Sequence, residues 1–211
     1  MGPDGFITAL REQKLEHAFN PYVDLCPIHD RASAPKLRTR LLLDMLRVAS
    51  HSEVDAIWIG RDLGYRGGRR TGLALTDDIH IAAHAKRWGV SPERATKGGE
   101  IAERTAAVVW SVLDRVDAPI FLWNVFPFHP HEPSNEFTNR SHSAREREVG
   151  LGLLEQLIAL LRPKRLVAIG NDAANAALKV SGRTSAIVVR HPSYGGQTQF
   201  LAQMEVLYGK M

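Results

Sequence analysis

Three side chains that could carry out hydrolytic chemistry stand at the ends of short apolar segments. Asp62 follows the segment DAIWIG, Asn124 lies within PIFLWNVF, and His191 closes AIVVRH. A carboxylate can orient a water molecule or stabilise a positive charge, and an imidazole can donate a hydrogen bond to a developing anion. A carboxamide presents an acceptor and two donors in one plane, which suits the edge of a nucleobase. Each residue alone also has a purely structural explanation, as a salt-bridged aspartate, an amide bound to loop backbone or a packed histidine.

The loop that follows the first apolar segment is rich in glycine and arginine. It reads GRDLGYRGGRRTGLALTDD over residues 60–78. Its arginines are Arg61, Arg66, Arg69 and Arg70. Glycines allow close approach of the backbone to a phosphate, whereas a charged loop of this kind can equally be a solvated surface. The spacing matches neither a P-loop nor a dinucleotide-binding fingerprint. With 27 Lys and Arg against 23 Asp and Glu, the net charge of +4 is compatible with a polyanionic partner without requiring one.

The apolar pattern predicts the elements that would bring these side chains together. Short runs rich in β-branched residues predict buried strands at 55–60, 119–126, 165–170 and 186–191. Helical patterns lie at 37–48, 77–89 (with Thr76 as its cap), 100–116, 143–162, 171–180 and 198–208. Alternating strands and helices predict one α/β domain with a parallel sheet covered by helices on both faces. Ligands of such sheets bind at the carboxyl ends of the strands, which is where Asp62, Asn124 and His191 fall.

Composition excludes several classes of protein. The 211 residues suit a single core, and no apolar run is long enough for a membrane span. The first residues lack the pattern of a secretory signal, so a cytoplasmic location is expected. Cys26 is the only cysteine, which excludes a disulfide framework, a thiolate zinc site and a cysteine-ligated iron–sulfur cluster. Prolines interrupt the segment of His129 and His131, so we interpret these and His142 as surface-loop residues and expect neither metal nor cofactor.

The strand-end sequences resemble those of the uracil-DNA glycosylase superfamily. GRDLGYRGGRRTGLALTD aligns without gaps to the water-activating motif GQDPYHGPGQAHGLAFSV of family one. FLWN resembles the LLLN of that family, RHPSYGG resembles its HPSPLS, and VAIGNDAANAAL is similar to a strand-and-helix segment of other members. The resemblance covers about residues 50–205, and residues 1–50 are expected to add a helical segment. It implies a central four-stranded parallel sheet.

The resemblance also implies roles for individual residues. Asp62 would orient the attacking water and stabilise an oxocarbenium-like sugar, His191 would stabilise the uracil anion, and Asn124 would read the base edge and reject cytosine. Residues beside the base would be Arg61, Tyr65 and Leu75. Residues holding the DNA would be Ser193, Tyr194, Arg66, Arg69, Arg70 and Gln197. The implied activity is that of a monofunctional, monomeric uracil-DNA glycosylase acting on single- or double-stranded DNA with the base flipped out of the stack.

The sequence departs from the family pattern at positions that bear on specificity. Gly64 stands where family one has a tyrosine that blocks the 5-methyl group of thymine, and Tyr65 comes one residue later. Leu75 replaces the phenylalanine that stacks on uracil. After the HPS segment, Tyr194 or Gln197 would have to wedge into the duplex. Two alternatives therefore stay open: a non-catalytic lesion or abasic-site binder on the same fold, and a nucleotide-binding α/β enzyme unrelated to DNA.

Overall fold

The core of the protein is a four-stranded parallel sheet with the strand order β3-β2-β5-β6. The computed structural model describes residues 1–182 and 184–209. The strands are β2 (Ala56–Asp62), β3 (Ile120–Phe126), β5 (Arg165–Ile169) and β6 (Ser185–Val189). All three pairings are parallel, as the buried apolar runs predicted. The register sets Gly60 of β2 opposite Asn124 of β3, so that the carboxyl ends of the two strands lie side by side.

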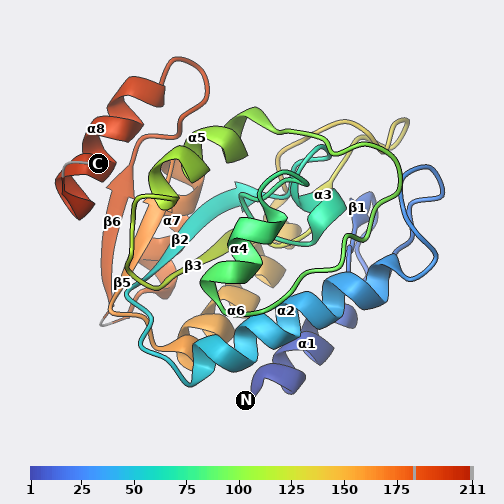
Figure 1. The fold of residues 1–211 in the computed structure, drawn as a ribbon, viewed down its shortest axis with the longest axis horizontal. Helices are drawn as coiled ribbons and strands as arrows, with labels where there is room; N and C mark the ends of the chain where they lie inside the picture. Colours follow the sequence, from blue (N-terminus) through green and yellow to red (C-terminus); the bar gives the residue numbers. More distant parts are fainter. Residues whose placement is uncertain (183, 210–211) are drawn as a thin grey trace.

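Helices cover both faces of this sheet (Figure 1). One face packs against α1 (Pro3–Arg11), α2 (Ala34–Ser50), α6 (Ala144–Leu161) and α7 (Asn171–Val180). The other packs against α5 (Arg104–Leu113) and α8 (Gln197–Tyr208). Strand β2 shows how side chains alternate between the two layers, because Ile57 and Ile59 enter the first core and Trp58 the second. The predicted α/β architecture is confirmed, and α1 and α2 of the N-terminal segment belong to the first core.

Four short elements complete the fold. Helices α3 (Gly68–Thr71) and α4 (Ile81–Arg87) lie between β2 and β3, and β1 (Ala18–Phe19) pairs antiparallel with β4 (His129–Pro130). The helix predicted from residue 77 starts only at Ile81, and the hydroxyl of Thr76 donates to the carbonyl of Ala74 instead of capping it. Asp77 precedes the helix because its buried carboxylate accepts the backbone N–H groups of His80 and Glu103, at 3.0 and 2.6 Å.

Helix α6 is fixed tightly at both its start and its middle. Ser143 and Glu146 form a capping box, in which the serine hydroxyl accepts from the Glu146 N–H and the glutamate accepts from the Ser143 N–H. At Gly150 a side chain would clash with the carbonyl of Val125, so glycine lets the helix approach β3 closely. The start of α6 therefore holds the preceding His142 in a defined place. Over residues 1–182 and 184–209, no helix combines the length and apolar character needed to cross a bilayer.

Candidate active site

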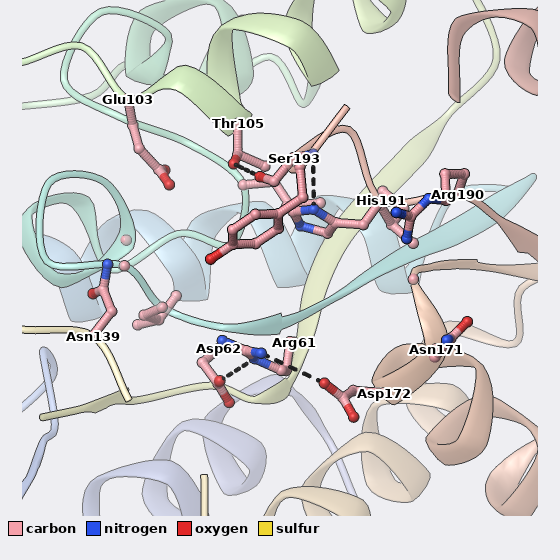
Figure 2. A pocket seen from close by; sticks show the side chains of 17 residues that line it. Arg61, Asp62, Glu103, Thr105, Asn139, Asn171, Asp172, Arg190, His191 and Ser193 are labelled. Atoms are coloured by element: carbon pink, nitrogen blue, oxygen red, sulfur yellow. Dashed lines mark hydrogen bonds and ion pairs between the residues drawn. The ribbon is translucent and has the colours of Figure 1, made fainter. Parts of the chain in front are cut away.

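A pocket of about 450 Å³ opens where β2, β5 and β6 end. Its walls come from the loop after β2, the start of α5, the start of α7 and the turn after β6. Of the residues that the sequence assigned to a site, those on its lining are Arg61, Asp62, Leu75, His191, Ser193 and Tyr194. Figure 2 shows the side chains of Asp62 and His191 reaching into this cavity from different elements. The volume lies in the range of ordinary small-ligand sites.

Both oxygens of the Asp62 carboxylate are held by hydrogen-bond donors. Nε of Arg61 donates to Oδ2 at 2.7 Å, and Nδ1 of His142 bonds to Oδ1. Because an ionised carboxylate only accepts, Nδ1 of His142 must carry the proton. The guanidinium of Arg61 reaches on to Asp172, 3.6 Å away, which ties the end of β2 to the start of α7. The Asp62 side chain is only 7% exposed, so its carboxylate is rigidly placed at the pocket wall.

His191 is arranged as a neutral hydrogen-bond donor. The backbone N–H of Ser193 donates to its Nδ1 at 3.1 Å, which leaves Nε2 as the nitrogen that bears hydrogen. Burial lowers the pKa of His191 below its usual value, and the positive charges of Arg61 and Arg190 lower it further. The turn that supports this geometry requires glycine at Gly196, where a side chain would clash with the carbonyl of His191. The ring can therefore donate to an acceptor in the pocket without being an imidazolium.

Asn124 is buried beside the pocket with its carboxamide unused. The residue is 1% exposed, and within the described chain neither the oxygen nor the nitrogen of its amide has a hydrogen-bond partner. It packs against Gly60, where a Cβ would clash with the amide oxygen and lie 3.0 Å from Cδ2 of Leu75. Leu75 lines the pocket and Asn124 does not, although both side chains lie against Gly60. An unpaired buried amide is unfavourable and indicates a site that a polar ligand completes.

Leu75 holds a strained backbone conformation at this wall. Its φ is 53°, a left-handed value that residues other than glycine and asparagine rarely adopt. The indole N–H of Trp110 donates to its carbonyl at 3.0 Å, and this bond from α5 fixes the turn. Such strain concentrates at ligand sites, because surrounding contacts must maintain it.

Glu103, which the sequence did not single out, is a further carboxyl group in the pocket, besides Asp62 and Asp172. It is the residue before α5, and its own N–H donates to Asp77. Burial raises the pKa of Glu103 to about 7, and the negative charge of Asp77 contributes to the shift. The surrounding sequence IAERTAAV carries no motif beyond a helix start, so only the tertiary fold brings Glu103 to the site.

Two of the predicted DNA-binding arginines are instead internal. Arg69 is 2% exposed, donates to Glu136 at 2.7 Å and stacks 3.8 Å from the centre of the Phe19 ring. Arg70 is 5% exposed and donates to Asp78 at 2.7 Å. The prediction that they grip the phosphate backbone is therefore wrong, because their guanidinium groups are already paired inside the protein. They hold the glycine-rich loop in shape.

Three other assigned residues lie outside the described pocket lining. Tyr65 does not fill the space at Gly64, because its hydroxyl accepts from Nε of Arg66 at 2.9 Å and its ring stacks against that guanidinium. The structure thus corrects its placement beside the base. Arg66 is exposed in the loop after β2, and Gln197 is the exposed first residue of α8. Tyr194, in contrast, does line the pocket, but it is 99% exposed with a φ of 53°, so it projects from the turn after His191.

Two of the three histidines interpreted as surface-loop residues, His129 and His142, are instead internal, whereas His131 is partly exposed in a loop. His129 is fully buried, and its pKa is lowered to about 3, mainly by burial and secondarily by Arg69. His142 is 5% exposed on its side chain and contacts Asp62. Among the described residues, no three His, Cys, Asp or Glu side chains group as metal ligands would. These histidines serve as hydrogen-bonding partners inside the fold.

Comparison with known proteins identifies the family. The family model of the uracil-DNA glycosylase superfamily matches residues 53–206, which include every pocket element described above. The chain belongs to the uracil-DNA glycosylase superfamily. As a member of this superfamily it has a DNA glycosylase fold, and the predicted resemblance is confirmed. No curated protein sequence matches the chain.

A solved structure shows the same fold over nearly the whole chain. The crystal structure of wild-type SMUG2 from Pedobacter heparinus superposes with a TM-score of 0.65 at 11% sequence identity. The match covers 97% of this superfamily member and 96% of that chain. It therefore includes α1 and α2, which precede the part matched by the family model.

Proposed function

We propose that this glycosylase hydrolyses the N-glycosidic bond of uracil flipped out of DNA and leaves an abasic site. The observation that carries the proposal is the pairing, in one pocket of a glycosylase fold, of a rigidly held carboxylate at Asp62 with a neutral donor at His191. Charge separates when a glycosidic bond breaks, with positive charge on the sugar and negative charge on the base. A carboxylate and a fixed N–H can stabilise these two halves in a site that excludes water.

In the proposed reaction, Asp62 orients the attacking water and stabilises the sugar. Two hydrogen bonds occupy the carboxylate, which has about four acceptor sites, so capacity for a water remains. The bond between C1′ of the sugar and N1 of uracil breaks, and its electron pair leaves with the base. The water oxygen then bonds to C1′ and its released proton passes to solvent. His191 donates from Nε2 to O2 of the uracil anion, as its tautomer allows.

Asn124 would recognise the base once Leu75 moves aside. Its unpaired oxygen and nitrogen match N3–H and O4 of uracil, and cytosine would present a donor where uracil has an acceptor. Sites that hydrogen-bond one base reject an analogue that leaves buried polar groups unpaired. Burying the amide without a partner is unfavourable in the free protein. Binding of the matching base would remove this cost.

The DNA would be held along the rim of the pocket. Arg66 offers an exposed cation, and Ser193 lies beside His191 with its hydroxyl 3.3 Å from that of Thr105. Tyr194, which is 99% exposed, would replace the extruded base in the duplex, with Gln197 as the neighbouring candidate. Flipping a base from the stack costs a few kcal/mol, and such an inserted side chain offsets part of that cost.

Single-turnover excision from labelled oligonucleotides tests the proposal. Uracil would be placed in a single strand, opposite guanine and opposite adenine, and Asp62→Asn and His191→Ala would be compared with the wild type. Each variant should be slower by at least about a hundredfold, the usual effect of removing such a group. Glu205→Gln on the exposed face of α8 is a matched control that should keep the wild-type rate. Tight binding to abasic DNA with no release of uracil by the wild type would instead favour a non-catalytic lesion binder.

A further inference from the structure

The wall of the pocket that faces His191 is built around the carboxyl group of Glu103. Figure 2 shows Glu103 pointing into the cavity from the N-terminal end of α5, across from the His191 ring. Two glycines of the loop after β2 make room for it. A Cβ on Gly64 would lie 3.3 Å from one carboxyl oxygen of Glu103, and a Cβ on Gly67 would clash with the other. The carboxyl group therefore packs directly against the backbone of this loop.

The chemistry of uracil places the methyl group of thymine at this wall. In a pyrimidine ring C5 lies opposite C2, and the carbonyl on C2 is the one that His191 would bind. A substituent on C5 therefore points away from His191 and toward the opposite wall. This orientation rests on the proposed function, because it requires His191 to bind O2 of a flipped base. Leu75 and Asn124 lie together at Gly60, whereas Glu103 lies over Gly64 and Gly67.

We infer that Glu103, and not a side chain of the loop at position 64, is the residue that excludes thymine from this pocket. Its carboxyl group occupies space that a 5-methyl group would need. Pressing a methyl group against a carboxyl also removes water from the polar group without giving it a hydrogen-bond partner, which is unfavourable. Both effects leave uracil unaffected, because uracil has only hydrogen at C5.

The ratio of single-turnover rates on thymine and uracil, each opposite guanine in the same duplex, tests this role. Glu103→Ala removes the carboxyl and should raise the thymine-to-uracil ratio by at least about tenfold, the lower end of what one methyl group contributes to discrimination. Glu103→Gln keeps the shape and should stay close to the wild-type ratio. Glu103→Asp withdraws the carboxyl by one methylene and should give an intermediate ratio. Glu100→Ala, on the same segment and largely exposed, is the matched control.

A double variant tests whether a side chain at position 64 can occupy the space of the Glu103 carboxyl group. Adding Gly64→Tyr to Glu103→Ala should restore the rejection of thymine, because the new side chain would enter the volume that the carboxyl vacates. Uracil release that persists in Glu103→Ala with an unchanged ratio would overturn the inference while leaving the proposed function standing. An equal change of the thymine-to-uracil ratio in Glu100→Ala would also overturn the inference. Absence of uracil release from the wild type would instead remove the proposed function and this inference together. If Glu103→Ala fails to fold, Glu103→Asp decides by the same ratio.

Discussion

The imidazole of His142 donates from Nδ1 to the carboxylate of Asp62, across 80 positions of sequence. Arg61 supplies the second donor from the neighbouring position on β2. The capping box at Ser143 fixes the chain immediately after the histidine, so the start of α6 sets the orientation of the carboxylate. In the proposed reaction His142 would therefore be a positioning residue, which acts through Asp62.

Replacing His142 should slow excision without weakening DNA binding. A hydrogen bond to a charged group contributes about 1.5–3 kcal/mol, so His142→Ala should lower the single-turnover rate by roughly ten- to a hundredfold. The enzyme concentration that gives half-maximal rate should stay unchanged. His142→Asn, whose amide can donate from nearly the same place as Nδ1, should recover most of the rate. His131→Ala is the control, and a wild-type rate in His142→Ala would refute the role.

The buried amide of Asn124 should lower the stability of the fold and contribute to recognition of the base. Its amide is buried without a partner among the described residues, so Asn124→Leu removes a desolvation penalty while keeping the number and branching of the side-chain heavy atoms. We expect the melting temperature to rise by about 2–4 °C, which corresponds to about 1 kcal/mol in a protein of this size. Uracil excision should fall by at least about a hundredfold. Calorimetry and the oligonucleotide assay on the same preparation measure both quantities.

A second buried asparagine provides the matched comparison for that experiment. Asn20 is 4% exposed, and its amide donates to the carbonyl of Leu10 at 2.9 Å and accepts from the N–H of Tyr22 at 3.1 Å. Asn20→Leu would leave those backbone groups unpaired, so it should lower the melting temperature. A fall of similar size in Asn124→Leu would show that the Asn124 amide contributes to the fold rather than to base recognition.

The strands and the main site residues could be predicted because their signals are local. Continuous apolar runs mark strands that are buried on both faces, and parallel strands end at one edge of the sheet. Asp62 and His191 follow such runs and do line one pocket. Asn124 lies at the same edge, although it is not on the pocket lining and Leu75 is. Local pattern therefore predicted which residues gather there, and tertiary packing decided which of them face the cavity.

The residues that the sequence misplaced are those whose partners lie far away in the chain. Arg69 looked like a surface cation because its partner, Glu136, lies 67 positions further along the chain. Glu103 lines the pocket from just before α5, and His142 contacts Asp62 from just before α6. The local sequence of neither residue predicts its contact. A charge pattern reports the number of ionic groups in a segment, but burial depends on long-range pairing that one sequence does not display.

The stability of the protein should decrease as Glu103 ionises. Its pKa is raised to about 7 in the folded state by burial and by Asp77, so the folded protein retains a proton that the unfolded chain loses near pH 4.5. The free energy of unfolding should therefore decline as the pH rises from about 4.5 through about 7, by up to about 3 kcal/mol. Glu103→Gln should remove this component, whereas Glu100→Gln should leave it in place. Urea denaturation at pH 5 and pH 8 compares the three proteins, and equal pH dependence in wild type and Glu103→Gln would contradict the assignment.

Two arginines of the glycine-rich loop should have different roles. Arg66 should contribute to DNA binding, and Arg70 should stabilise the fold. Arg66→Ala removes an exposed cation and should weaken DNA binding while lowering the slope of log affinity against log salt by about one. Arg70→Ala leaves Asp78 buried without its partner and should destabilise the fold by about 3–5 kcal/mol. Fluorescence anisotropy in a salt series and thermal melts distinguish these effects. A reduced salt slope in Arg70→Ala, with unchanged melting, would restore it as a phosphate contact.

Tyr194 should matter only when the uracil has to leave a duplex. Its ring is 99% exposed at the end of a turn that Gly196 holds close to His191, so it can enter the stack while the base occupies the pocket. Tyr194→Ala should slow excision from double-stranded DNA by about tenfold or more, because unstacking a paired base costs a few kcal/mol and the wedge offsets part of it. Excision from single-stranded DNA should change by less than about twofold, since no paired base has to be extruded. Gln197→Ala, three residues later, separates the two candidates for the wedge. A loss of equal size on both substrates would assign Tyr194 to the pocket itself, where it would contact the base or position His191.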